Sequence, residues 1–140
     1  MAGERTGEFE AVPVADDAVA RGAEDVMYVV SRAYDYRADS KRITVCTVRE
    51  DYIGEIGNGV RLGAELMDTG ESDAPGSLVW PTDIALDSDE NLYVTDEWLN
   101  RVAIFAKDGD WLGAWGTVGQ GDGDIDKPSG IAIDSENNVY

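Results

Sequence analysis

The chain has no histidine and only one cysteine among its 140 residues. The lack of histidine excludes histidine-based acid–base catalysis and imidazole ligation of a metal by this portion of the protein. Cys46 on its own can form neither an intrachain disulfide nor a Cys-x-x-Cys metal pair. No run of 18 apolar residues exists in the sequence, so no segment has the character of a transmembrane helix.

Positive charge is also scarce, because 11 Lys and Arg face 29 Asp and Glu, for a net charge of −18. This imbalance disfavours nucleic acid and anionic membranes as partners, since phosphate groups would be repelled. Residues 1–13 are charged and lack the apolar core of a secretory signal. We therefore expect a cytoplasmic protein by default, or an extracytoplasmic one if Met1 is not the true start.

An internal repeat is the most informative feature that is present. Residues 81–93 read PTDIALDSDENLY, and residues 128–140, which lie 47 positions further on, read PSGIAIDSENNVY. Repeats with a period of about 20–50 residues are typical of solenoids, propellers and arrays. The second copy stops at Tyr140, in the middle of an expected strand, so we expect the chain to be a fragment of a longer repeat protein.

Each complete copy predicts four short strands and no helix. In the copy that begins at Pro81, the strands are expected at residues 84–86, 92–95, 102–105 and 111–115. Asp, Asn and Gly occupy the intervening turns, where their tolerance of left-handed and Asx-turn geometry is useful. Trp111 and Trp115 would share one face of the last strand by period two and would act as packing residues.

An earlier, stretched copy precedes this one. Residues 42–46 and 52–57 match 101–105 and 111–116 at a spacing of 59, and residues 27–30 match 92–95 at a spacing of 65. Cys46 then occupies the place of Phe105, so we expect it to be a small core residue. The connection between the second and third strands is six residues longer in the earlier copy, because 65 exceeds 59 by six.

Units of four short antiparallel strands with apolar residues on both faces are typical of β-propeller blades. We expect an acidic N-terminal segment at 1–26, a first blade at 27–57, an inter-blade loop at 58–78, a second blade at 79–116, and a loop with a truncated third blade at 117–140. Within the first segment, residues 9–14 are either a strand or part of a disordered acidic leader.

Residues 79–96, followed by Asn100-Arg101-Val102 and Phe105, resemble the NHL repeat, and residues 116–131 resemble the loop between its blades. The resemblance implies an all-β fold: a partial, truncated propeller of the NHL type, with about two blades of a ring of about six. Leu99-Asn100 stands where the family usually has Asn-His. This departure alters a surface loop and leaves the strands unchanged.

The lengthened connection of the first blade is the candidate ligand site. The resemblance implies that such connections lie on the face where propellers usually bind ligands. Two Tyr, two Arg and a nearby Trp could hold a planar or anionic ligand by stacking and bidentate hydrogen bonds. These residues are Arg32, Tyr34, Tyr36, Arg37 and Trp98. The alternative is an ordinary solvated hairpin loop.

Other motifs favour structural roles. The Asp122-Gly-Asp124 stretch lacks the Gly and Glu that an EF-hand requires at positions six and twelve, so it is interpreted as a polar loop. Asp96 and Arg101 flank the connection between the second and third strands. They are expected to fix that hairpin through an ion pair or hydrogen bonds.

Two functions of different classes follow. The first is a non-catalytic scaffold that binds a protein, peptide or small-molecule ligand, without a cofactor in this portion. The second is part of a metal-dependent propeller lyase resembling the peptidyl-hydroxyglycine amidating lyases, in which Arg32 would match a first-blade Arg. Zinc or calcium would then belong to the full-length parent. Two isolated blades expose unpaired edges and apolar faces, so we expect the chain alone to be poorly soluble or oligomeric.

Overall fold

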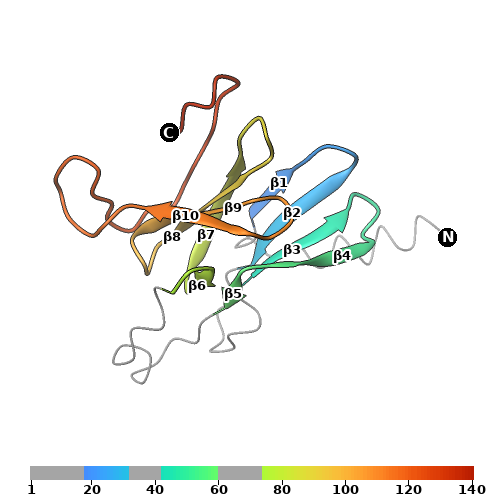
Figure 1. Cartoon of the computed structure of the whole chain (residues 1–140), viewed down its shortest axis with the longest axis horizontal. Helices are drawn as coiled ribbons and strands as arrows, with labels where there is room; N and C mark the ends of the chain where they lie inside the picture. Colours follow the sequence, from blue (N-terminus) through green and yellow to red (C-terminus); the bar gives the residue numbers. More distant parts are fainter. Residues whose placement is uncertain (1–17, 32–41, 60–73) are drawn as a thin grey trace.

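The structure, a computed structural model, describes residues 18–31, 42–59 and 74–140. Within these ranges the regular structure is made of strands alone, arranged as two four-stranded antiparallel sheets and one short parallel pair (Figure 1). Sheet 1 has the order β1-β2-β3-β4, and sheet 2 has the order β10-β9-β8-β7. Each sheet is a meander in which strands that follow each other in sequence are neighbours in space.

The strands of sheet 1 are β1 (Ala18–Arg21), β2 (Val26–Ser31), β3 (Arg42–Thr47) and β4 (Tyr52–Ile56). Those of sheet 2 are β7 (Pro81–Leu86), β8 (Leu92–Asp96), β9 (Arg101–Phe105) and β10 (Trp111–Trp115). The parallel pair consists of β5 (Asn58–Gly59) and β6 (Ser77–Leu78). The four strands predicted for the later copy are confirmed as one antiparallel meander, and the fold is all-β as expected.

Strand β1 is a further element that sequence analysis does not predict. It pairs with β2 over its whole length, from Ala18 opposite Val30 to Arg21 opposite Met27. It completes sheet 1 as the counterpart of β7 in sheet 2. The candidate strand at residues 9–14 lies outside the described residues.

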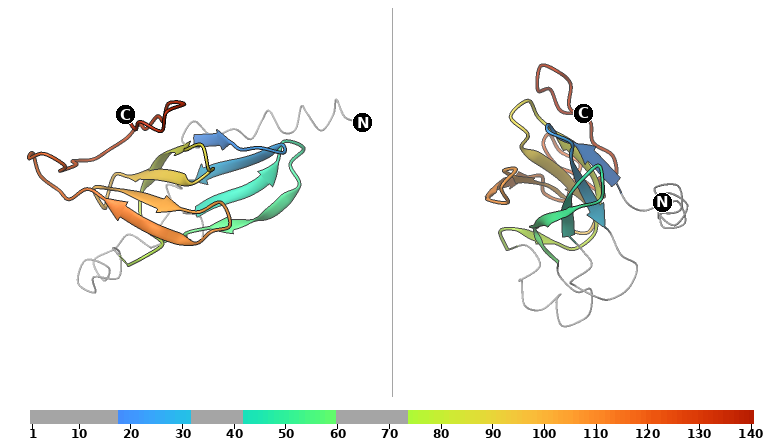
Figure 2. Two further views of the ribbon diagram at one scale, coloured as in Figure 1. Left: turned by 45° about the horizontal axis from the view of Figure 1, so that its top comes forward. Right: turned by 90° about the vertical axis from the view of Figure 1, so that its right-hand side faces the viewer.

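The core lies between the two sheets, which pack face to face (Figure 2). We call the faces that meet there the covered faces, and the opposite ones the open faces. The covered face of sheet 1 contributes Ala20, Tyr28, Val30, Ile43, Val45 and Ile56, and that of sheet 2 contributes Ile84, Leu92, Val94, Ala103 and Phe105. Residues on one face alternate along each strand because the side-chain period is two.

A β-bulge interrupts this alternation in the outer strand of each sheet. In sheet 2 the register shifts between Trp111 and Gly113, so that Trp111 lies opposite Phe105 and Trp115 lies opposite Val102. Because Phe105 and Val102 are three residues apart on β9, the two tryptophans point to opposite faces. The prediction that they share one face is therefore wrong, since an extra residue was inserted between them.

The same bulge occurs in sheet 1, where Cys46 lies opposite Tyr52 and Val45 lies opposite Gly54. The inserted residue is Ile53 in sheet 1 and Leu112 in sheet 2, and both are 54% exposed. Cys46 is half-buried, whereas its counterpart Phe105 is almost completely buried. The bulge is thus a repeated feature of the fold.

The turns after β1 and β7 are connected by a repeated hydrogen bond between neighbouring units. Glu90 Oε1 accepts a hydrogen bond from the backbone N–H of Ala23, at 2.8 Å. Asn137, which is 47 positions after Glu90, accepts one through Oδ1 from the backbone N–H of Ser88, at 2.9 Å. Both acceptor residues have a left-handed backbone, with φ of 61° and 63°. This side-chain-to-backbone contact therefore recurs from one repeat to the next.

The C-terminal segment begins the next repeat and lies beside sheet 2, near the β7–β8 turn (Figure 1). The backbone N–H of Ile131 donates to the Asp83 carboxylate at 3.0 Å, and Ile133 forms an antiparallel bridge with Val139. The Thr82 hydroxyl donates to the carbonyl of Pro128 at 3.2 Å. The segment thus takes the same place beside β7 that β7 takes beside β1.

Candidate ligand-binding end

The antiparallel meanders place the end of β2, the start of β3 and the β8–β9 connection at one end of the sheets, together with the segments that enter β7 and leave β10. We call this the connection end. The tight turns after β1, β3, β7 and β9 lie at the other end, which we call the turn end. Figure 1 shows β5 and β6 at the connection end and the β1–β2 and β3–β4 turns at the opposite side.

Asp96 organises the connection end of sheet 2. Its side chain is completely buried, and its carboxylate accepts four backbone N–H groups. The donors are Val79 at 2.8 Å, Trp80 at 3.1 Å, Trp98 at 3.1 Å and Leu99 at 3.0 Å. A buried carboxylate is tolerated because these donors replace its hydration. The bonds fix both the segment that enters β7 and the β8–β9 connection.

Trp98 is presented to solvent by this fixed connection. It is 46% exposed although its own backbone N–H is bonded to Asp96. Asn100, with φ of 52°, donates from Nδ2 to the carbonyl of Trp98 at 3.3 Å and accepts from the N–H of Lys127 at 2.9 Å. The connection is therefore held by bonds on both sides, and the exposed indole sits on a rigid backbone.

Arg101 fixes the segment that precedes β7 at the connection end. Its guanidinium donates to the carbonyls of Ala74 and Ser77, at 3.4 Å and 3.0 Å, and lies 5.2 Å from the centre of the Trp111 ring. Arg101 faces Asp96 in the β8–β9 register, as the sequence suggests. Asp96 fixes the hairpin through its bonds from Trp98 and Leu99, whereas the bonds of Arg101 described above reach the segment before β7.

Of the five predicted ligand-binding residues, the structure describes only Trp98. Arg32, Tyr34, Tyr36 and Arg37 lie outside the described residues, between the end of β2 at Ser31 and the start of β3 at Arg42. These bounds enclose 42 − 31 − 1 = 10 residues, against 101 − 96 − 1 = 4 for the β8–β9 connection. Ser31 and Arg42, which flank the longer connection, lie at the same end of the sheets as Trp98.

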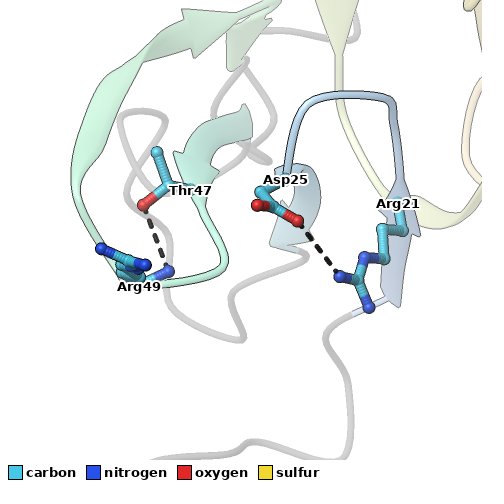
Figure 3. Close-up of polar contacts among 4 residues, drawn as sticks. All are labelled: Arg21, Asp25, Thr47 and Arg49. Carbon is cyan, nitrogen blue, oxygen red and sulfur yellow. Dashed lines mark hydrogen bonds and ion pairs between the residues drawn. The ribbon is translucent and has the colours of Figure 1, made fainter.

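The described arginines of sheet 1 form local contacts. Arg42 forms an ion pair with Glu55 across β3 and β4. Figure 3 shows Arg21 and Arg49 at the turn end, where Arg21 pairs with Asp25 at 3.5 Å and the N–H of Arg49 donates to the Thr47 hydroxyl at 3.2 Å. Arg21 and Asp25 are both largely exposed, so this pair contributes little stability. Arg21 and Arg49 are therefore not part of the candidate site.

Two other groups considered from the sequence have local roles. Asp124 accepts from the Thr117 hydroxyl at 2.8 Å and the Gly121 N–H at 2.9 Å, and these bonds hold the pKa of its carboxyl below the ordinary value. Burial, together with the charge of Glu50, raises the pKa of the Cys46 thiol, which opposes formation of a reactive thiolate. Among the described residues, no three acidic or cysteine side chains gather into a candidate metal site.

Sequence reasoning missed the buried Asp96 as the residue that shapes the site. A signal existed, because Asp96 ends a strand two positions before Trp98, and only four residues separate it from the next strand. An Asp in such a short connection commonly accepts backbone N–H groups of the following residues. The bonds to Val79 and Trp80 could not be inferred, since they depend on how the chain enters β7.

Comparison with known proteins agrees with this architecture. Two four-stranded meanders stacked face to face, with a third beginning beyond them, define part of a β-propeller. Residues 78–105, which run from the end of β6 to the end of β9, match the family model of the NHL repeat. The chain therefore carries an NHL repeat. No curated protein matches the chain.

Two solved structures of virginiamycin B lyase from Staphylococcus aureus are similar in fold. One is a catalytically inactive variant, with a histidine replaced by alanine, together with quinupristin; it has a TM-score of 0.54 and 19% sequence identity. The other is the selenomethionine-substituted lyase, with a TM-score of 0.53 and 18% identity. Each alignment covers 91% of this chain and 35% of the lyase. The chain thus spans about a third of the length of these propellers.

Within the described residues, the structure has no helix long and apolar enough to cross a membrane.

Proposed function

We propose that this propeller scaffold binds a peptide or a planar small molecule at its connection end, and that Trp98 contacts the ligand. The observation that carries this proposal is an indole left 46% exposed on a connection whose backbone is fixed by the buried Asp96. A rigid aromatic side chain loses little conformational entropy on binding, and tryptophan is enriched among residues that dominate binding energy.

We propose that the β2–β3 connection, which contains Arg32, Tyr34, Tyr36 and Arg37, contributes to the same site. Its two flanking residues, Ser31 and Arg42, lie at the connection end. The arginine guanidinium groups would form bidentate hydrogen bonds with carboxylate groups of a ligand, and the tyrosine rings would stack on its planar parts. The net charge of −18 favours a ligand that is neutral or cationic outside such groups.

The lyase interpretation is the second candidate, and the folds of the two lyases are what favours it. The inactive lyase was obtained by removing a histidine, and this sequence contains none. A lyase activity of that kind would need a histidine from outside this sequence. We therefore assign the 140 residues a binding role, and a metal-dependent reaction would belong to a longer parent protein.

The experiment uses quinupristin as the probe, since it accompanies a protein of the same fold. Saturable quenching of tryptophan fluorescence is expected, with the affinity about 30-fold lower in Trp98→Ala, because loss of a central aromatic contact costs about 2 kcal/mol. The control is Trp115→Ala, which removes a tryptophan that is 43% exposed on a sheet face. Equal losses in both variants, or no saturable binding, would refute the proposal for this probe. Turnover of quinupristin would instead favour the lyase.

A further inference from the structure

The open face of each sheet corresponds, position by position, to the covered face of the other sheet. On the open face of sheet 2, Tyr93, Ile104 and Trp115 take the places that Tyr28, Val45 and Ile56 take on the covered face of sheet 1. Tyr28, Val45 and Ile56 are only 3%, 8% and 4% exposed, because sheet 2 covers them. Trp115 is 43% exposed, and Tyr93 and Ile104 are half-buried.

The open face of sheet 1 shows the converse. Its residues correspond to the covered face of sheet 2: Val19 to Ile84, Met27 to Leu92, Val29 to Val94, Cys46 to Phe105 and Tyr52 to Trp111. Leu92 and Val94 have no exposed surface, and Trp111 packs against the core. In contrast, Val19 is 56% exposed and Tyr52 is 65% exposed.

We propose that a second copy of this chain covers these surfaces, with the open face of its sheet 1 on the open face of sheet 2 of the first copy. The contact would repeat between copies the packing that already exists within one copy. Because the two open faces differ, the association is heterologous, and every added copy leaves one face of each kind free. The assemblies therefore extend beyond dimers, as closed rings or open chains.

The C-terminal segment competes with this docking. Residues 128–140 lie beside β7, where β1 of the second copy would sit, and are held by bonds that include those between Asn137 and Ser88. The outer part of the open face, around Trp115, stays free of the segment and offers the first contact. Full docking requires the segment to leave, which weakens the association.

Net charge also opposes association, because each copy carries −18. Repulsion between exposed charges falls when salt shortens the screening length, from about 10 Å at 0.1 M to about 3 Å at 1 M ionic strength. We expect assembly of the 140-residue chain to increase with both protein concentration and salt. An association driven by ion pairs would weaken with salt instead.

The test is a complementation experiment by analytical ultracentrifugation at high ionic strength. Tyr52→Arg blocks the open face of sheet 1, and Trp115→Arg blocks that of sheet 2. Each variant alone is expected to be monomeric, since every contact needs both faces. An equimolar mixture retains one usable pair of faces and should form a 1:1 dimer and nothing larger. Arginine also lowers the net negative charge, so charge repulsion cannot explain the loss.

Matched controls come from the two bulges. Ile53→Arg and Leu112→Arg place the same charge on the same strands as the blocked positions, β4 and β10. Leu112 stays 54% exposed on a sheet whose adjacent face is covered, so the bulge position lies outside such an interface. Both controls should associate like the unmodified chain. A monomeric unmodified chain, a mixture that stays monomeric, or controls that dissociate equally would overturn the proposal.

Asn137→Ala tests the competition. It removes both side-chain hydrogen bonds to Ser88 and should strengthen association about two- to ten-fold, the effect of a typical hydrogen bond. Weaker association in this variant would show that the segment belongs to the interface, contrary to the proposal.

Discussion

Sheet 1 and sheet 2 have the same strand order and the same bulge, but they fix their connections with different side chains. Sheet 2 has Asp87 in its first turn and Asp96 at the end of β8. The corresponding residues of sheet 1 are Gly22 and Ser31. The strand arrangement is thus maintained with and without these carboxylates. Apolar packing between the sheets sets the fold, and the carboxylates reinforce sheet 2.

The first turns show this directly. The N–H of Asp87 donates to the carbonyl of Asn91 at 3.1 Å, and the N–H of Gly22 donates to that of Val26 at 2.8 Å. Asp87 then adds carboxylate bonds to its own turn, which the C-terminal repeat reproduces at Asp134. The NHL match covers residues 78–105, which include both Asp87 and Asp96. We infer that these carboxylates make the later repeat recognisable, whereas sheet 1 keeps only the geometry.

The largest expected effect is the difference in stability loss between replacing Asp96 and replacing its counterpart Ser31. Asp96→Ala leaves four backbone N–H groups without their acceptor and should lower the free energy of unfolding by about 3–5 kcal/mol. Ser31→Ala should cost about 0.5 kcal/mol. Urea denaturation of both variants measures the difference. Asp96→Asn, which keeps one acceptor oxygen, should lie between them. Equal losses for Asp96→Ala and Ser31→Ala would contradict the role assigned to Asp96.

A second pair compares the covered face of sheet 2 with the open face of sheet 1. Leu92 is completely buried, so Leu92→Ala should cost about 2–5 kcal/mol through lost contacts and the cavity left behind. Met27 is its half-buried counterpart, and Met27→Ala should lower the free energy of unfolding by about 1 kcal/mol. Denaturation at low protein concentration is the measurement, because association would cover Met27. A larger loss for Met27→Ala than for Leu92→Ala would reverse the assignment of the faces.

The smallest expected effect is a pH dependence of stability that comes from Asp87 in the β7–β8 turn of sheet 2. Burial acts to raise the pKa of Asp87, but hydrogen bonds from Asn91, Asp89 and Tyr93 outweigh it, so the pKa lies below the ordinary value. A lowered native pKa stabilises the fold above the unfolded value of about 3.9, and this contribution disappears as the pH falls through the native pKa.

The measurement is the free energy of unfolding between about pH 6 and pH 2.5 for the unmodified chain and for Asp87→Asn. The difference between the two should shrink as the pH falls, since the variant has no carboxylate to lose. Asp122→Asn is the control, because it removes the same negative charge from an exposed position in the loop after β10. A difference that stays constant across the range would exclude a contribution from Asp87 ionisation.

The strands of both sheets could largely be predicted, because short β-rich runs alternate with turns rich in Asp, Asn and Gly. β1 was missed although the offset of 65 places Val19-Ala20-Arg21 at the position of Ile84-Ala85-Leu86. Its two alanines and short length give a weak strand signal. The bulges could not be predicted from period two, since they depend on which residues face each other across β9 and β10.

For the candidate site, the sequence indicated that Trp98 lies in a loop, and the structure shows its side chain 46% exposed. The ligand-binding role of Trp98 stays a prediction. The sequence did not indicate that a buried carboxylate fixes the loop, because the bonds from Val79 and Trp80 to Asp96 join residues 17 and 16 positions apart. Arg101 likewise donates to carbonyls of residues 24 and 27 positions earlier. Such contacts arise from tertiary packing, which a local pattern does not encode.

The bond from Ala23 to Glu90, and its successor from Ser88 to Asn137, has a consequence for how such repeats diverge. A carboxylate and an amide serve equally, because the neighbouring N–H requires only an oxygen at the right distance. The constraint that persists is a turn residue able to adopt positive φ with an acceptor on its side chain. The residue type can therefore differ at this position while the hydrogen bond that joins successive units is kept.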